Sequence, residues 1–363
     1  MRSGHDGEHG AATGRRGGRL GDIGPLAYRW RVYVLAVGIF AVMTAIAPNF
    51  MTGGNFANIL KAAGINVLAA AGFTIVMISG QLDLSIGSAM TLGGMMAVGL
   101  QPQLGWAGSC AVALLCGLAV GLANGILVAK ARINSFIVTL GTMIILQNIV
   151  FIYCRGGTIS ATSFDLSDWF QYPLFSSLPA GWLRETLGPS LTPRILLPYA
   201  VMAALAVLVR WTPTGRAFYL LGGNPQTAWY SGLRVDRLLI GAFVLSGVLS
   251  ALGGAVIAMS EANANPTLGD NSLMTIVAAV IIGGTSMQGG KGSLLGTAVA
   301  LVALAALVNG LSCRGEGYEV QLMASGLVLA LIIVYDAWSE YRRAKRRGQR
   351  KDLLKELRAA AGD

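Results

Sequence analysis

Charged residues are scarce in this chain, because Asp, Glu, Lys and Arg together make up only 12% of its 363 residues. A soluble globular domain usually carries about 25% charged residues. Hydrophobic residues account for 54%, and the existing charges gather in the two ends and a few loops. This composition excludes a soluble globular domain. It predicts an all-α polytopic membrane protein built almost entirely of transmembrane helices.

The residues that catalytic and metal sites need are also scarce. The two histidines, His5 and His9, lie at the start of the chain, and the four cysteines form no Cys-x-x-Cys pair. Nothing therefore remains in the body of the chain for a His-based triad, a typical zinc site or a redox cluster. We expect no enzymatic activity, no metal and no cofactor bound by this chain.

A net charge of +10 could indicate nucleic acid, so the placement of the charge matters. Of the 27 Lys and Arg residues, six lie between Arg2 and Arg31 and nine between Arg342 and Arg358. Basic ends around an apolar middle favour cytoplasmic flanks lying on membrane lipid over a groove for nucleic acid. We expect a disordered basic N-terminal tail (1–31), a transmembrane domain (32–338) and a basic C-terminal tail (339–363).

The apolar segments number ten, judged against the roughly 20 apolar residues that cross a bilayer. They are Val32–Ala47, Ala62–Ser79, Ile86–Leu100, Ala107–Ala129, Ile133–Tyr153, Ile195–Trp211, Leu238–Met259, Leu273–Ser286, Ser293–Leu311 and Val320–Trp338. The third and the eighth are short and contain Gly, so we expect them to be broken or re-entrant.

The distribution of Lys and Arg predicts the orientation of these segments. With the N-terminus inside, the tails and cytoplasmic loops hold 22 basic residues and the outer loops hold five. This imbalance predicts ten spans with both termini in the cytoplasm. The longest connection, 154–194, then lies outside, and its aromatic residues form either a short interfacial helix or anchors at the headgroup level.

Glycine is abundant inside the expected spans. Gly117, Gly121 and Gly125 repeat every four residues on one face of the fourth span, which predicts close helix packing.

The most Gly-rich loop, Gly283–Ser293, includes Gly283, Gly284, Gly289 and Gly290, whose expected role is close backbone approach. A P-loop requires Gly, four intervening residues, Gly-Lys and then Ser or Thr. Thr285 and Gly292 occupy those positions, so this loop is no nucleotide site.

Several motifs follow one another from about 32 to 336. Gly80–Ser88 reads Gly-Gln-Leu-Asp-Leu-Ser-Ile-Gly-Ser. Asn124–Val128 is followed by Ile133–Gly141, and Gly215-Arg216 is followed by Gly222–Asn224 and Ser231-Gly232. Together with the Gly283–Ser293 loop, these motifs resemble, in consistent order, the permease subunits of ribose-type ABC sugar importers, in which the first motif reads Gly-Gly-Ile-Asp-Leu-Ser-Val-Gly-Ser. The resemblance implies a transport subunit in the bacterial inner membrane.

The chain also departs from that family's pattern at two places. It has Thr227-Ala228-Trp229 where Ala-Ala-Arg is common, and Leu273-Met274-Thr275 where Glu-Leu-Asp is usual. The second departure removes two acids near the expected outer mouth, which bears on the solute and on partner contacts more than on the fold.

The segment Asn224–Gly232 predicts a short isolated helix in a cytoplasmic loop. Asn224 is a good N-cap, Pro225 suits the first helical position and Gly232 suits a left-handed residue after the last turn. Such a helix is marginal alone, so it needs a surface to dock on, and Ala228 and Trp229 lie on it. The alternative is a turn resting on neighbouring loops. The resemblance implies a coupling helix, with Arg216, seated on the ATPase subunit.

Asp83 is the only acid between Asp22 and Asp165, and it lies between two apolar spans. An acid inside the membrane is costly and suggests function. It either caps backbone N–H groups at a broken helix or contacts the solute pathway. A proton relay lacks a visible second acid or His.

Uncharged polar residues are scattered through the spans. Those taken as candidates for the pathway, together with Asp83, are Ser85, Asn66, Asn124, Thr139 and Asn148. They suit a polyhydroxy solute, although hydrogen bonds between helices explain most of them equally well.

These observations together predict the permease subunit of a bacterial ABC importer for a sugar or a sugar-like polyol. The resemblance implies a second permease subunit, a cytoplasmic ATPase that uses ATP and Mg²⁺, and a periplasmic substrate-binding protein. The alternative is an ion- or proton-coupled secondary transporter, for which Asp83 is the only strong candidate. A membrane-bound enzyme finds no nucleophile–base pair or metal site in the sequence.

Overall fold

The computed structural model describes residues 23–173, 191–331 and 334. The chain divides into two compact units, Met1–Arg31 and Val32–Asp363. The expected C-terminal tail, most of the N-terminal tail and the middle of the 154–194 connection lie outside the described residues.

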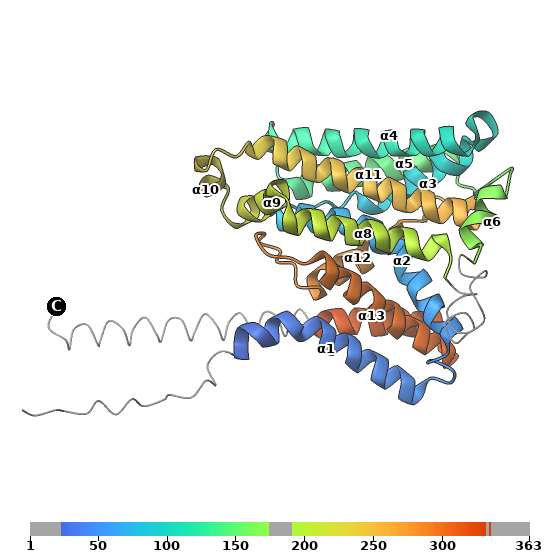
Figure 1. The fold of residues 1–363 in the computed structure, drawn as a ribbon. Coiled ribbons are helices and arrows are strands. Elements are labelled where there is room, and N and C mark those ends of the chain that lie inside the picture. Colours follow the sequence, from blue (N-terminus) through green and yellow to red (C-terminus); the bar gives the residue numbers. More distant parts are fainter. Residues whose placement is uncertain (1–22, 174–190, 332–333, 335–363) are drawn as a thin grey trace, which may run out of the picture. The chain divides into compact units, whose positions relative to one another are not determined.

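The described residues are mostly helical (Figure 1). The helices are α1 Ile23–Ile46, α2 Gly53–Ile78, α3 Ile86–Gly99, α4 Gln101–Ala129, α5 Ser135–Tyr153, α6 Asp165–Gln171, α8 Pro193–Trp211, α9 Pro213–Gly223, α10 Pro225–Tyr230, α11 Val235–Glu261, α12 Asp270–Ile282 and α13 Leu294–Cys313, and a further helix covers Tyr318–Leu331. Two short strands, β1 Ile159–Ser160 and β2 Asn263–Ala264, pair antiparallel with Ile159 opposite Ala264.

Six of these helices, α2, α4, α5, α8, α11 and α13, are long and apolar enough to cross a membrane. Four shorter apolar helices cover Trp30–Ile46, Ile86–Gly99, Ser272–Ile282 and Tyr318–Leu331. Each segment expected from the sequence overlaps one of these ten helices, and residues 332–333 and 335–338 of the last expected segment lie outside the described residues. The third and the eighth are among the short ones. The all-α membrane fold is confirmed, while ten crossings and cytoplasmic termini stay predictions.

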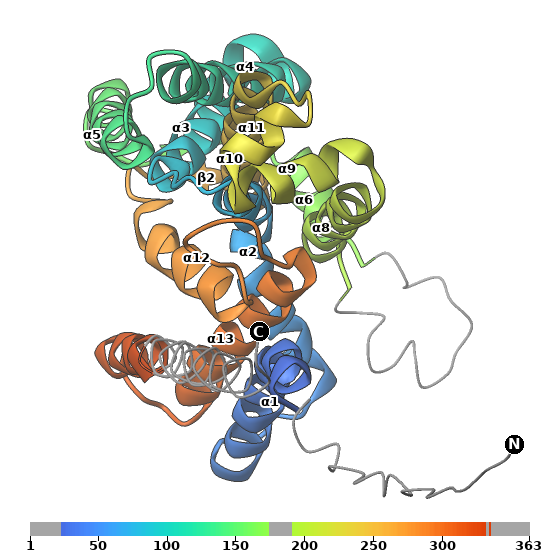
Figure 2. The same cartoon turned by 90° about the vertical axis from the view of Figure 1, so that its left-hand side faces the viewer.

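The centre of the Val32–Asp363 unit is formed by α2, α3 and α11. Helix α11 packs against α2, α3 and α4, and the large side chains Phe73, Met90 and Phe243 are completely buried between these elements. Figure 2 looks along the helices and shows α4 and α5 outside α3 and α11. Helix α5 keeps large apolar side chains such as Ile145 and Ile152 exposed, as expected for contact with lipid.

The expected packing role of the repeated glycines on α4 is confirmed. A Cβ atom on Gly117 or Gly121 would collide with the α11 backbone at Gly247 or Phe243, and one on Gly125 would lie 2.9 Å from the Ile240 Cα. The two backbones are therefore close enough that only glycine fits, which is how small residues let membrane helices approach.

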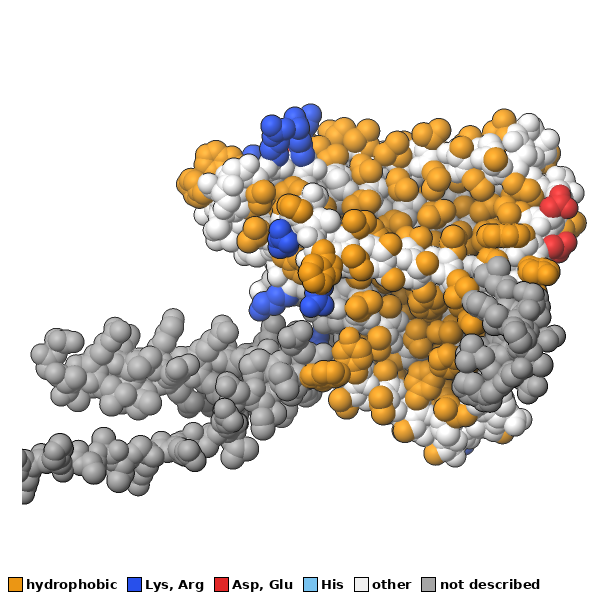
Figure 3. All heavy atoms as spheres, in the orientation of Figure 1, with side chains coloured by type: hydrophobic (Ala, Val, Ile, Leu, Met, Phe, Trp, Pro, Cys, Tyr) orange, Lys and Arg blue, Asp and Glu red, His pale blue; other side chains and the backbone are white. Residues whose placement is uncertain are grey.

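Charge is distributed unevenly along this unit. Figure 3 shows Lys and Arg side chains gathered at the end that carries α9 and α10, and Asp and Glu side chains at the opposite end near α6. Hydrophobic side chains cover the surface between them. This arrangement is typical of a protein that crosses a membrane with its basic end in the cytoplasm.

Replacement of Gly121 by Val tests the contact between α4 and α11. The added side chain meets backbone, which cannot move aside as a side chain can, so we expect a cost of about 3 kcal/mol or more. The apparent melting temperature in detergent should fall by about 5 °C or more. Gly241→Val is the control, because Gly241 on α11 has nothing within 4 Å of the added Cβ atom. Equal melting temperatures for the two variants would contradict this account.

Candidate functional site

The short helix α10 is built by its own sequence, as predicted. The Asn224 Oδ1 accepts hydrogen bonds from the backbone N–H groups of Gln226 and Thr227, both at 3.0 Å. Pro225 begins the helix, and Gly232 follows it with a φ of 78°. The Gly232 N–H donates to the Trp229 carbonyl and the next N–H donates to the Ala228 carbonyl. Both ends of α10 are therefore closed by capping motifs.

Helix α10 buries one face and exposes an aromatic pair. Ala228 is 1% exposed, whereas Trp229 and Tyr230 are 65% and 79% exposed. The two rings lie edge to face with centroids 5.1 Å apart. Aromatic side chains of this size are enriched at protein interfaces. A helix this short also needs tertiary contacts to persist. The exposed rings therefore mark the most obvious contact surface at this end of the chain.

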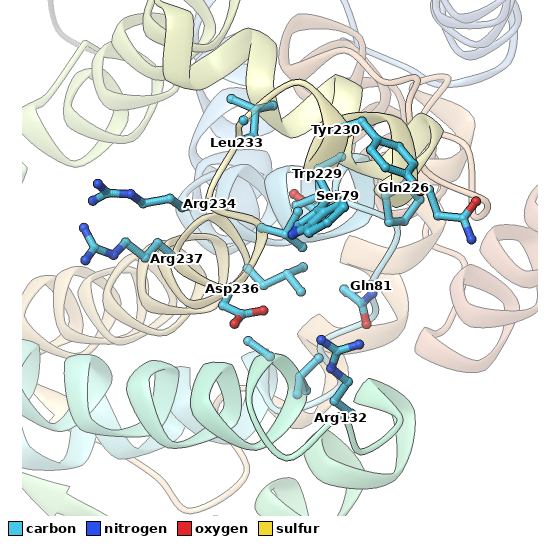
Figure 4. A pocket seen from close by; sticks show the side chains of 17 residues that line it. Ser79, Gln81, Arg132, Gln226, Trp229, Tyr230, Leu233, Arg234, Asp236 and Arg237 are labelled. Carbon is cyan, nitrogen blue, oxygen red and sulfur yellow. The ribbon is translucent and has the colours of Figure 1, made fainter.

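A groove of about 950 Å³ lies beside α10 (Figure 4). It is bordered by α10, the start of α11, the end of α4 and the residues after α2, and it is rich in arginine. In Figure 4, Arg234 and Arg237 point to the same side, and Arg132 lies on the other side of Asp236. A predominantly basic groove next to exposed aromatic rings suits an acidic or mixed protein segment.

Helix α10 is joined to the membrane helices through α9. Ala217, Phe218 and Leu221 bury the inner face of α9. The Tyr219 hydroxyl donates to the Gly292 carbonyl at 3.1 Å, in the loop between α12 and α13. Arg216 is exposed on α9 and donates to the Trp211 carbonyl at 3.3 Å. Because α9 directly precedes α10, Arg216 belongs to the same basic end of the unit as α10 (Figure 3).

Three backbone segments are in direct contact at the end of α9. We call this contact the glycine junction, and it comprises Gly80, Gly222, Gly289 and Gly290. The Gly290 N–H donates to the Ile78 carbonyl at 2.8 Å. A Cβ atom would lie 2.7 Å from the Gly80 Cα if placed on Gly289, and would collide with the Ile78 carbonyl if placed on Gly222. Gly80, Gly289 and Gly290 also have φ values of 71° to 81°, which favour glycine.

The glycine junction joins the end of α2, the end of α9 and the Gly283–Ser293 loop. The close approach expected for this loop is therefore present. Gly283 lies against the start of α13, where its Cβ atom would be 2.5 Å from the Thr297 nitrogen, and Gly284 has a φ of 96°. No side chain lies between the backbones at these contacts. A displacement of α9 toward them must therefore move the neighbouring backbones as well.

Asp83 lies in the break between α2 and α3 and is 2% exposed. Its Oδ1 accepts hydrogen bonds from the Ser85 backbone N–H at 3.0 Å and from the Ser85 hydroxyl at 2.6 Å. Its Oδ2 accepts one from the Ser246 hydroxyl of α11 at 2.7 Å. Ser85, rather than Asp83, directly precedes α3. The carboxylate thus accepts the backbone N–H of the N-cap residue itself, and Asp83 lies two residues before the expected capping position.

Further hydrogen bonds extend this network into α4 and α5. The Asn124 Nδ2 donates to the Ser85 hydroxyl at 2.9 Å, and the Thr142 hydroxyl donates to the Asn124 Oδ1 at 2.6 Å. The Thr139 hydroxyl oxygen accepts the Leu84 backbone N–H at 3.0 Å. Ser85, Asn124 and Thr139 are at most 1% exposed. These hydrogen bonds connect the break between α2 and α3 to α4 and α5, and none of the three residues lines the groove beside α10.

Two residues expected on the pathway lie away from this network. Asn148 is exposed on α5, and its Nδ2 donates to the Ile144 carbonyl of the same helix at 2.8 Å. Asn66 lies on α2 beside a second cavity, and its Oδ1 is buried without a hydrogen-bond partner among the described residues. The expected set therefore divides into a buried network and two separate positions.

Two buried charged residues have partners from distant parts of the chain that the sequence does not predict. Ser246 binds Asp83, and Arg194, which is 7% exposed, forms a 2.6 Å ion pair with Glu261. A buried acid indicates that donors must exist, but a single sequence does not identify which serine supplies them. In the sequence, Arg194 is one of the few basic residues expected in an outer loop. Its partner becomes evident only when α8 and α11 are placed side by side.

The chain matches known proteins over most of its length. The family model described as the branched-chain amino acid transport system permease component matches residues 55–335. The chain is 32% identical to a ribose import permease protein of Haemophilus influenzae, over 86% of this chain and 94% of that protein. It is 33% identical to the ribose import permease protein of Escherichia coli K12 (82% and 90% covered) and to an autoinducer 2 import system permease protein of Yersinia pestis (82% and 81%). No solved structure matches it.

Substitution of Gly290 by Val tests the glycine junction. Valine is strained at a φ of 71° and its Cβ atom would lie 2.6 Å from the Gly223 Cα. We expect the level of folded protein in the membrane to fall several-fold, as measured by fluorescence-detected size exclusion. Gly284→Val should be harmful for the same conformational reason.

Lys291→Ala is the matched control for this loop. The Lys291 side chain is exposed, and its carbonyl accepts the Ser286 N–H at 3.0 Å, a bond that the substitution leaves in place. The variant should therefore keep the normal protein level. Normal levels of Gly290→Val, or binding of ATP by the purified chain alone that Lys291→Ala removes, would contradict the assignment of this loop.

Proposed function

The chain belongs to the family of branched-chain amino acid transport system permease components, and from that premise we propose that it is the membrane subunit of a bacterial ABC importer for a sugar or a sugar-like polyol. The resemblance to ribose-type permeases found in the sequence is confirmed by relatives over most of the chain. Relatives named for ribose and autoinducer 2 import support a small polyhydroxy solute.

The observation that carries the proposal is the exposed aromatic pair on α10. Trp229 and Tyr230 lie on a capped helix at the basic end of the unit, beside an arginine-rich groove. We infer that a separate cytoplasmic ATPase subunit, which binds ATP and Mg²⁺, covers this surface. A periplasmic binding protein then delivers solute at the opposite end, and a second permease subunit, identical or related, completes the pathway in the inner membrane.

The glycine junction supplies a route from the ATPase to the membrane helices. Movement of α10 is passed to α9, with which it shares Asn224 as a capping residue. From α9 the backbone contacts lead to the ends of α2, α12 and α13. In the proposed alternating access, closure of the ATPase pair would shift these helix ends together. This chain would supply the pathway and the mechanical linkage, and perform no covalent chemistry.

Replacement of both Trp229 and Tyr230 by Ala tests the proposed ATPase contact. Central aromatic residues of an interface cost 2 kcal/mol or more when truncated, so affinity should fall at least about 30-fold. We expect the co-expressed ATPase to be lost on purification and uptake to cease, with normal amounts of permease in the membrane. The control is Trp169→Ala on α6, an aromatic side chain that is 50% exposed at the opposite end of the unit (Figure 1), whereas its neighbour Phe170 is buried and is left unchanged. Normal co-purification with the α10 variant would remove this assignment.

A second candidate function, an ion- or proton-coupled secondary transporter, is favoured by one observation. Asp83 is a buried acid inside the expected membrane region, and none of the ion pairs among the described residues involves it. Its direct side-chain partners are serines, which do not titrate, and no second acid or His is among its hydrogen-bond partners in the described part of the chain.

Two substitutions of Asp83 separate the two candidates. In an ABC permease, Asp83→Asn should retain much of the uptake, because an amide oxygen can still accept from Ser85 and the Ser246 hydroxyl can reorient as acceptor. Asp83→Leu strands the donors of Ser85 and Ser246, at about 1–3 kcal/mol each, and should be inactive. Uptake is measured against the amount of protein in the membrane. An inactive Asn variant, with wild-type uptake that collapses when the proton gradient is dissipated at constant ATP, would favour the secondary transporter.

A further inference from the structure

A second cavity, of about 620 Å³, lies between α2, α12, α13 and the helix Tyr318–Leu331. Its volume falls within the range of about 300–1,000 Å³ that is usual for small-molecule sites. It extends from Asp270 at the start of α12 to Asn66 on α2, about 20 Å along α2 from Gly53. Since α12 ends at the glycine-rich loop, Asp270 lies at the end opposite the glycine junction.

Polar atoms along this cavity have hydrogen-bonding capacity that the described residues leave unused. The Asn66 Oδ1 is buried without a partner, which is costly unless a solute or water donates to it. The Asn309 Oδ1 accepts a hydrogen bond from the Asn55 Nδ2 at 2.8 Å. No described residue accepts a hydrogen bond from the Asn309 Nδ2. The Gln147 Nε2 donates to only one of the two Asp270 carboxylate oxygens, at 3.0 Å.

The charge of the lining restricts what can enter. Among the described residues that line the cavity, Asp270 is the only charged one, and none is Lys, Arg or His. A carboxylate at the mouth of an otherwise uncharged cavity repels anions and attracts cations. Phosphorylated and carboxylated sugars are therefore disfavoured, whereas neutral or amine-bearing polyols are not.

The cavity also contains positions at which this chain departs from the family pattern. Met274 and Thr275 both line it, where Leu and Asp are usual, and Met274 is 67% exposed. Asp270 is therefore the single acid among the described residues that line the cavity. The replacement of the usual Leu and Asp by Met274 and Thr275 therefore changes the lining of the cavity, where it would affect which solutes bind.

We propose that this cavity is the outer vestibule of the solute pathway, that Asn66 presents a hydrogen-bond acceptor at its inner end, and that Asp270 makes it selective for neutral or cationic polyols over anionic ones. This inference rests on the proposed transport function and names the chemical class of its solute. Transported hydroxyl groups would donate to Asn66 as they leave water.

Thiol labelling in membranes tests the vestibule without knowledge of the solute. In a chain whose four native cysteines are replaced by Ala, Asn66→Cys is treated with a trimethylammonium-bearing and with a sulfonate-bearing methanethiosulfonate reagent. After correction for their rates with a free thiol, the cationic reagent should react about tenfold faster. Asp270→Asn should remove most of this preference, and Met274→Arg should reverse it. Ala119→Cys, exposed on α4 where lipid is expected, should react with neither reagent.

Each possible outcome decides the inference. Failure of Asn66→Cys to react with either reagent would overturn the vestibule, because the cavity would then hold lipid or be closed. Equal rates for the two reagents, or a preference that survives Asp270→Asn, would overturn the selectivity. The measurement needs neither ATPase nor ATP, so its failure is distinct from failure of the proposed ATPase contact, which the α10 variants report.

Discussion

Direct contact between backbones is the constraint on which this molecule depends. At the glycine junction the end of α2, the end of α9 and the loop between α12 and α13 touch without intervening side chains. The same principle operates between α4 and α11, where three glycines on one helix face the backbone of the other. In a bilayer, where lipid is as apolar as the helices, such close packing supplies much of the attraction between them.

The polar groups inside the bundle follow from the same environment. A break between α2 and α3 frees backbone donors that lipid cannot satisfy. Asp83 and Thr139 accept those of Ser85 and Leu84, and Ser246 and Asn124 bring α11 and α4 into the network. This network fixes the position of α3 relative to α4, α5 and α11. The packed core and the break between α2 and α3 thus form one framework, and α10 and Asp270 lie at opposite ends of it.

Features coded by neighbouring residues could be predicted from the sequence, and features that need distant partners could not. Asn224, Pro225 and Gly232 specify α10 locally, and the four-residue glycine repeat indicates a packing face without knowledge of the partner helix. The ten apolar segments fall on helices for the same reason. By contrast, the pairing of Asp83 with Ser246 joins residues 163 positions apart, and the cavity at Asn66 needs four helices in place. No local pattern carries that information.

We propose that a separate ATPase subunit covers α10, and photocrosslinking tests this contact. A photoreactive benzoylphenylalanine is placed at Tyr230, and membranes that contain the assembled transporter are irradiated. We expect a covalent adduct with a chain that contains a P-loop, and no such adduct from the same group at Trp169, at the opposite end of the unit. An adduct from Trp169 with none from Tyr230, in a transporter that still takes up solute, would contradict it.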